Sequence, residues 1–385
     1  MPVNFQQSGS DINSRFVPKW AFGQGQLWAA GTNYSTSGTL GNGQTTTRYS
    51  SPVQVATGGI NWMGRPDTIA ASFGCGAAIK TDGTLWTWGK NYRGALGQGD
   101  VSNRSTPTQV GSDKTWRAVH GQAGGFKAIK SDGTMWGWGD NSYGQVGVGT
   151  ASGTHVSNPT QVAGNYWKQA SNAGTSAYGT KTDGTLWEWG RNWLPSLGGV
   201  GAAFITPVQI GTDRTWKEVR ALSSGGALAI KTDGTLWSWT YYQSDAAASS
   251  AAYTRTSPTQ VGSDTTWARL ALQTNATAGA IKTDGSLWAW GYNGGNFGNG
   301  TTAGSSSPVQ VGTDYNWKYC SFFNGCWGLK TDGTLWTWGA NGYGQGARGN
   351  IATASTPVQL GTDTNWVTAA SGYSPGHTYF LKSII

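Results

Sequence analysis

The chain has 385 residues and a formal net charge of +8, yet only 11% of its residues are charged, against roughly 25% in average soluble domains. It contains 61 Gly and 23 Trp, a composition that indicates turn-rich, aromatic β structure and argues against a helical protein. No apolar run is long enough to cross a bilayer as a helix.

Residues 1–21 precede the regular part of the chain and are polar and mixed in composition. They lack the basic-then-apolar pattern of a secretory signal peptide. The phrase at residues 6–17 resembles the N-terminal leader of phage tail and virion proteins, which implies a docking arm. An unstructured terminus and a strap across the fold are the alternatives. The expected contact residues of the arm are Phe5, Phe16, Val17 and Trp20.

One phrase, of the type AIKTDGTLWTWG at residues 78–89, returns along the chain. Its first Trp recurs at intervals of 48 to 58 residues, at Trp28, Trp86, Trp136, Trp187, Trp237, Trp288 and Trp336. A second Trp follows two residues later in six copies, a third opens a later segment of each unit, and 20 of the 23 Trp obey this rhythm. A period near 50 residues predicts a propeller or a solenoid.

The chemistry of a single unit decides between these folds. In residues 78–89 two short strands meet at an Asp-Gly pair, which favours the positive φ of a tight hairpin. A Gly-rich loop follows, and residues 105–116 supply two more short strands. Four strands per unit and no convincing helix predict the blade of a β-propeller.

Three units depart from the pattern: two after their third strand, at residues 191–205 and 240–255, and the first through a longer stretch at residues 53–74. Scaffold repeats vary where the scaffold does not need them, so these loops are candidates for a specific surface. The candidate binding residues are aromatic side chains of the two loops after third strands, which are of the kind that stacks on sugar rings: Trp193, Tyr241, Tyr242 and Tyr253. The alternative is that these side chains cover a neighbouring blade.

The two ends of the chain complement each other. Residues 25–31 read as the third strand of a unit, but no second strand precedes them. Residues 378–382 read as the second strand of a unit, but no third strand follows them. We therefore predict that 378–382 pairs antiparallel with 25–31. This pairing completes a seventh blade and closes the ring, which protects the sheet edges.

The repeated unit resembles that of the regulator of chromosome condensation family over residues 22–385. In the second copy the resemblance is carried by Lys80, Asp82, Gly83, Leu85, Trp86, Trp88, Gly89, Asn91, Gly94, Leu96, Gly97, Gly99, Pro107, Val110 and Trp116. The resemblance implies an all-β, seven-bladed propeller with four-stranded blades. The residues of the repeat are more similar to those of the bacterial and phage branch of the family than to those of the eukaryotic branch. The predicted domains are an arm at 1–21 and a propeller at 22–385.

Catalysis and cofactor binding find no support in the residues. The three His, at His120, His155 and His377, have no partners at metal-ligand spacing. The repeated Asp residues belong to turns. The three Cys are expected as buried thiols, and whether Cys320 and Cys326 form a bridge stays open. We predict no enzyme, no cofactor and no metal.

The basic charge does not favour nucleic acid. The repeated Lys residues are spread by the repeat, whereas a nucleic-acid binder needs a basic face or stripe. The founding member of the resembled family is an exchange factor for a small GTPase that also binds chromatin, through particular loops and a basic tail. Here residues 1–21 hold two basic residues, Arg15 and Lys19, so this activity is not carried over. The fold itself does not fix a function.

The sequence therefore predicts a non-catalytic phage virion component: a capsid decoration, tail or adhesion protein attached through its arm. Its expected partners are other virion proteins, sister subunits, or a glycan or protein on a host surface. Two alternatives stay open. One is a protein-binding regulator such as a small-GTPase exchange factor, and the other is a carbohydrate-binding adhesin.

Overall fold

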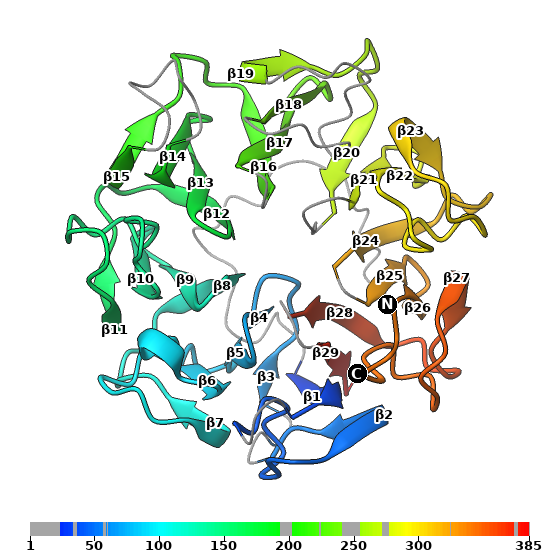
Figure 1. The fold of residues 1–385 in the computed structure, drawn as a ribbon, viewed down its shortest axis with the longest axis horizontal. Helices are drawn as coiled ribbons and strands as arrows, with labels where there is room; N and C mark the ends of the chain where they lie inside the picture. The colour runs from blue at the N-terminus through cyan, green and yellow to red at the C-terminus, as the bar shows by residue number, and fades with distance from the viewer. Residues whose placement is uncertain are drawn as a thin grey trace, which may run out of the picture.

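Seven antiparallel β-sheets stand around a central axis as the blades of a propeller (Figure 1). The computed structural model describes residues 24–33, 37–56, 59, 61–192, 202–222, 225–240, 255–271, 277–323, 325–372 and 376–384. The seven-bladed, all-β fold predicted from the tryptophan rhythm is confirmed.

Each blade has four strands, which run from the axis to the circumference. The innermost strands are β4 (Ile69–Ala71), β8 (Trp116–Gln122), β12 (Trp167–Ala173), β16 (Trp216–Leu222), β20 (Trp267–Leu270), β24 (Trp317–Ser321) and β28 (Trp366–Ser371). The second strands are β5 (Cys75–Ile79), β9 (Gly125–Lys130), β13 (Ser176–Lys181), β17 (Gly226–Lys231), β21 (Thr277–Lys282), β25 (Cys326–Lys330) and β29 (His377–Ser383).

The third strands are β1 (Gln24–Thr32), β6 (Leu85–Gly89), β10 (Met135–Gly139), β14 (Leu186–Arg191), β18 (Leu236–Thr240), β22 (Leu287–Gly291) and β26 (Leu335–Gly339). The outer strands are β2 (Arg48–Gln54), β7 (Arg104–Gln109), β11 (Val156–Gln161), β15 (Ala203–Gln209), β19 (Arg255–Gln260), β23 (Ser305–Gln310) and β27 (Ala354–Gln359). A two-residue strand, β3 (Trp62–Met63), also pairs with β1, and one 3-10 turn, η3, spans Tyr92–Gly94.

The seventh blade is built from both ends of the chain. Strand β29 pairs antiparallel with β1 in an unbroken register from Gly25 opposite Ser383 to Gly31 opposite His377. Figure 1 shows the blue β1 beside the dark red β29. The other edge of β29 pairs with β28. The predicted closure is confirmed, and the register is set by the same in–out alternation that operates in the other six blades.

Tryptophans join each blade to its neighbour. Six of the third strands carry a second Trp, such as Trp138 and Trp189, and each of these is fully buried. The indole N–H of Trp189 donates to the backbone oxygen of Gln145, in the loop of the preceding blade, at 3.0 Å. Gly147 in that loop has a φ of +83°, and a Cβ there would lie 2.7 Å from the Trp189 ring. A glycine is therefore required where the loop crosses the indole.

One lysine is buried between the blades. The Lys127 side chain in β9 has no exposed surface, and its ammonium donates to the backbone oxygen of Gln145 at 2.8 Å. Burial lowers the pKa of Lys127 from 10.5 to about 7. Transfer of a cation from water into the protein interior is costly in free energy, and the sequence pattern did not single out this residue.

Candidate functional site

The repeated Lys of each blade belongs to the scaffold. The Lys231 ammonium lies 3.8 Å from the ring centroid of Trp237 and 4.7 Å from that of Trp216. It also forms an ion pair with Asp213 at 2.6 Å. The same arrangement recurs around the ring, with ion pairs Lys130–Asp113, Lys282–Asp264, Lys330–Asp314 and Lys382–Asp363. These cation–π and ionic contacts hold two indoles in place, and they distribute the basic charge around the ring as predicted.

The Asp of each hairpin is a turn residue, as expected. Oδ1 of Asp82 accepts hydrogen bonds from the backbone N–H of Thr84 at 3.0 Å and from its hydroxyl at 2.7 Å. The Thr84 hydroxyl in turn accepts the indole N–H of Trp86 at 2.8 Å. These hydrogen bonds from Trp to Thr and from Thr to Asp therefore hold the hairpin turn in a fixed position relative to the third strand.

The opposite end of the ring carries the loops that join third and fourth strands. In one of them Oδ1 of Asn141 accepts the backbone N–H of Val146 at 3.0 Å, and its amide donates to the Thr150 hydroxyl at 3.0 Å. Equivalent asparagines, Asn91, Asn293 and Asn341, are also fully buried and bond across their loops. These amides fix the loop backbone, so the side chains that it exposes have a defined position.

The fixed loops expose tyrosines on one face of the ring. Tyr92, Tyr143, Tyr292 and Tyr343 have exposed fractions of 51%, 38%, 61% and 47%. The third strands all run in the same direction through their blades, so these loops share one end of the propeller. We call this end the tyrosine face and define it by these four residues.

Cations lie beside three of these tyrosines. The Arg93 guanidinium is 4.8 Å from the centroid of the Tyr92 ring. Two others reach across a blade boundary: Arg191 lies 5.3 Å from the Tyr143 ring, and Arg48 lies 5.9 Å from the Tyr343 ring. In each of these contacts a positively charged guanidinium group lies next to an aromatic ring on the surface of the protein.

The acidic side chains of this face are already engaged. Arg93 also spans two blades, because both oxygens of Asp140 accept from it at 3.0 Å. Asp100 pairs with Arg104 at 2.7 Å. The tyrosine face therefore presents aromatic rings and guanidinium groups, while its nearby carboxylates are neutralised by neighbours.

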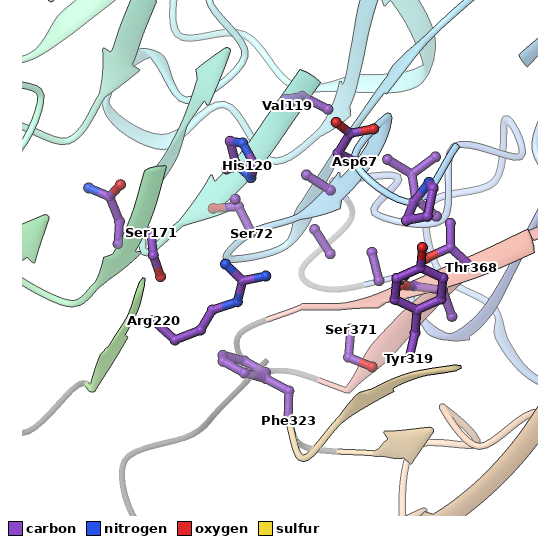
Figure 2. A pocket seen from close by; sticks show the side chains of 18 of the residues that line it. Asp67, Ser72, Val119, His120, Ser171, Arg220, Tyr319, Phe323, Thr368 and Ser371 are labelled. Atoms are coloured by element: carbon purple, nitrogen blue, oxygen red, sulfur yellow. Dashed lines mark hydrogen bonds between the residues drawn. The ribbon is translucent and has the colours of Figure 1, made fainter. Parts of the chain in front are cut away.

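A cavity of about 250 Å³ lies on the axis of the ring, where the innermost strands of all seven blades line it. Figure 2 shows the Arg220 side chain reaching into it from β16, toward the side where Ser72 and His120 lie. Arg220 forms an ion pair with Glu218 at 2.9 Å. Burial, and next the charges of Arg220 and Arg117, lower the pKa of His120 to about 3, so His120 is neutral near physiological pH.

The residues proposed for binding from sequence lie outside the described part of the chain. This holds for Trp193, Tyr241, Tyr242 and Tyr253, and for the arm residues Phe5, Phe16, Val17 and Trp20. The structure therefore leaves both proposals as predictions.

The cysteines are free and buried, at Cys75, Cys320 and Cys326. Burial raises the pKa of Cys75 to about 12, so this thiol is protonated and unreactive.

Among the described residues, no cluster of His, Cys, Asp and Glu could hold a metal ion. Within the same part of the chain, the structure contains no helix with the length and apolarity that a membrane crossing requires.

Sequence reasoning missed the tyrosine face and the axial cavity. The sequence does contain a signal for the tyrosine face, because a Tyr closely follows the loop Asn in the copies at residues 91–94, 141–144 and 341–344. The cavity has no such signal, since its polar residues come from different blades at unrelated sequence positions.

Residues 82–126, 132–174 and 332–381 match the sequence profile of the family described as Regulator of chromosome condensation (RCC1) repeat. The chain is therefore a seven-bladed β-propeller in which three segments match the RCC1 repeat. Comparison with curated protein sequences gives no match.

Solved structures with the same fold include human WBSCR16, at 19% identity and a TM-score of 0.76 over 94% of this chain and 100% of that chain. Prp20p from Saccharomyces cerevisiae, described with its binding properties to Gsp1p and histones, has 15% identity and a TM-score of 0.78 over 97% of each chain. Yeast RCC1 (Prp20) in its structure bound to Kap60 has 14% identity and a TM-score of 0.78 over 100% of this chain and 96% of that chain. At these identities the likeness establishes the fold.

Proposed function

We propose that this propeller is a non-catalytic protein-binding module that presents its tyrosine face to an acidic partner surface. The observation that carries the proposal is the placement of exposed tyrosines beside guanidinium groups on loops fixed by buried asparagines. Tyr and Arg are the side chains enriched at the energetic centres of protein interfaces. Rigid loops lower the ordering entropy that binding must overcome.

The structural relatives support the same class of function. Prp20p is known with its binding properties to Gsp1p and histones, and yeast RCC1 (Prp20) in a structure bound to Kap60, so these propellers bind proteins. From these relatives we transfer to this chain only the general function of protein binding. Exchange activity toward a small GTPase is the finer alternative, and accelerated release of a bound fluorescent nucleotide by the purified chain tests it.

The experiment compares two sets of exposed tyrosines. The chain, immobilised with its tyrosine face intact, is incubated with an extract of its source cells, and retained proteins are identified by mass spectrometry. The variant Tyr92→Ala/Tyr143→Ala/Tyr343→Ala should lose the specific partner. The control Tyr166→Ala/Tyr315→Ala removes tyrosines that are 65% and 60% exposed in the turns at the opposite end. Equal loss in both variants, or retention in the first, overturns the proposal.

The virion assignment rests on residues 1–21, and it stays a prediction of the sequence. If the chain is a virion component, its partner is another particle protein and the tyrosine face is one route of attachment. Mass spectrometry of purified particles tests this, and absence of the chain from them removes it. Binding to a glycan array, with Trp193→Ala as control, tests the carbohydrate alternative in the same way.

A further inference from the structure

We infer that the axial cavity is a binding site for a small organic anion, a carboxylate or phosphate monoester carried on a flat apolar body. This site is separate from the tyrosine face, and its existence does not depend on the proposed protein partner.

Buried polar atoms converge on the cavity. Within the described residues, four polar atoms are buried and have no hydrogen-bond partner although their residues line the cavity: Arg220 Nε, His120 Nε2, Asn172 Oδ1 and Asp67 Oδ1. The indole N–H of Trp327, another lining residue, is also buried without a partner, and its side chain is only 3% exposed. Native proteins leave few such groups, and several around one cavity indicate that a ligand supplies their partners.

The charge around the cavity favours an anion. Glu218 is already saturated, since one oxygen binds Arg220 at 2.9 Å and the other accepts the backbone N–H of Leu270 at 3.0 Å. Asp67 pairs with Arg65 at 3.4 Å. Arg269 also lines the cavity, and it forms no ion pair with a carboxylate in the described part of the chain. The balance of charge is therefore positive.

Arg220 is the residue that recognises the anion. Its guanidinium projects from β16 into the cavity (Figure 2). Its Nη2 binds Glu218 and its Nη1 donates to the backbone oxygen of Val219 at 3.2 Å, so the Nε–H is the guanidinium donor that has no partner. A donor of this kind matches a carboxylate or phosphate oxygen. Because His120 is neutral, it adds a hydrogen bond to the ligand without adding charge.

The size and lining of the cavity define the rest of the ligand. An apolar cavity of about 150 Å³ holds a benzene molecule, so about 250 Å³ has room for a ring with an acidic group. Small side chains such as Ala70, Ala170 and Ala221 leave this room, and the Phe323 ring lines one side. A flat apolar body with one anionic end therefore fits.

Four probes test this on the full-length chain by isothermal titration calorimetry: benzoate, phenyl phosphate, benzyl alcohol and benzamidine. We expect benzoate or phenyl phosphate to bind at least about tenfold more tightly than the neutral and cationic probes. The two anions distinguish a carboxylate ligand from a phosphate ligand. Equal binding of all four probes shows that the cavity does not select an anion, and no anion binding up to about 10 mM shows that it takes up neither anion. Either result overturns the inference.

Variants locate the binding. Arg220→Met/Glu218→Gln removes both members of the ion pair, so no buried charge is left alone, and anion affinity should fall at least about tenfold. The matched control Arg214→Met/Asp183→Asn removes an ion pair on the surface, where the Arg214 side chain is 69% exposed. Circular dichroism checks folding. If the first variant does not fold, Arg220→Lys and His120→Phe replace it, and unchanged anion affinity in both overturns the inference.

Discussion

Replacement of the buried Lys127 by Leu should stabilise the protein near neutral pH. Leu is the residue of a related blade at this place, because Leu228 pairs with Arg220 as Lys127 pairs with His120. The backbone oxygen of Gln145 loses the ammonium but keeps the indole N–H of Trp189 at 3.0 Å. The substitution therefore removes a buried cation without leaving that oxygen unsatisfied.

The size of the effect follows from the pKa. Burial lowers the pKa of Lys127 from 10.5 to about 7, while the unfolded chain keeps the ordinary value. Between these values the unfolded state binds more protons, so the stability of the native protein rises with pH. At about 1.4 kcal/mol per pH unit, the penalty near neutral pH is about 5 kcal/mol. Most of it is still present at about pH 7, and roughly 2–3 kcal/mol of it is lost by about pH 9.

Urea unfolding followed by tryptophan fluorescence measures this at about pH 7, 8 and 9. The free-energy difference between Lys127→Leu and the parent chain should be largest at the lowest of these pH values and shrink by about 2–3 kcal/mol at the highest. Lys168→Leu, which replaces an exposed lysine of β12, is the matched control for the same substitution at the surface. A difference that is independent of pH, or a Lys127→Leu variant that is less stable throughout, refutes the reasoning.

Three further predictions concern the scaffold. Truncation after Gly376 removes β29 and both of its pairings, so the shortened chain should melt well below the full chain; equal melting temperatures would contradict the closure. Phe380→Ala removes a fully buried ring packed 6.0 Å from Trp366 and should lower the free energy of unfolding by about 3–5 kcal/mol in urea titrations. Burial tends to raise the pKa of Asp213, but hydrogen bonds led by Lys231 outweigh it and lower the pKa to about 2. Asp213→Asn should therefore lower the free energy of unfolding by less than about 1 kcal/mol at neutral pH. In acid unfolding, the difference in this free energy between the variant and the parent chain should vanish between about pH 4 and about pH 2.

The sequence by itself determined the number of blades, the strands within each and the joint between the chain ends. These features depend on local signals that every copy repeats, such as the turn at Asp82 and the alternation that places Trp86 and Trp88 on one face. Seven copies of one unit leave little ambiguity, and the missing strands at the two termini specify their own pairing. The structural role of the repeated Lys and Asp also follows from the repeat.

Only the tertiary structure decided which non-repeated side chains meet. Arg191 reaches Tyr143, and Arg93 reaches Asp140, because neighbouring blades pack at one particular tilt and spacing. Arg220 and His120 face one axial cavity for the same reason. These contacts join residues from different units, and the repeat pattern holds no record of them. Their geometry is fixed when the ring closes, since closure sets the distance between innermost strands across the axis.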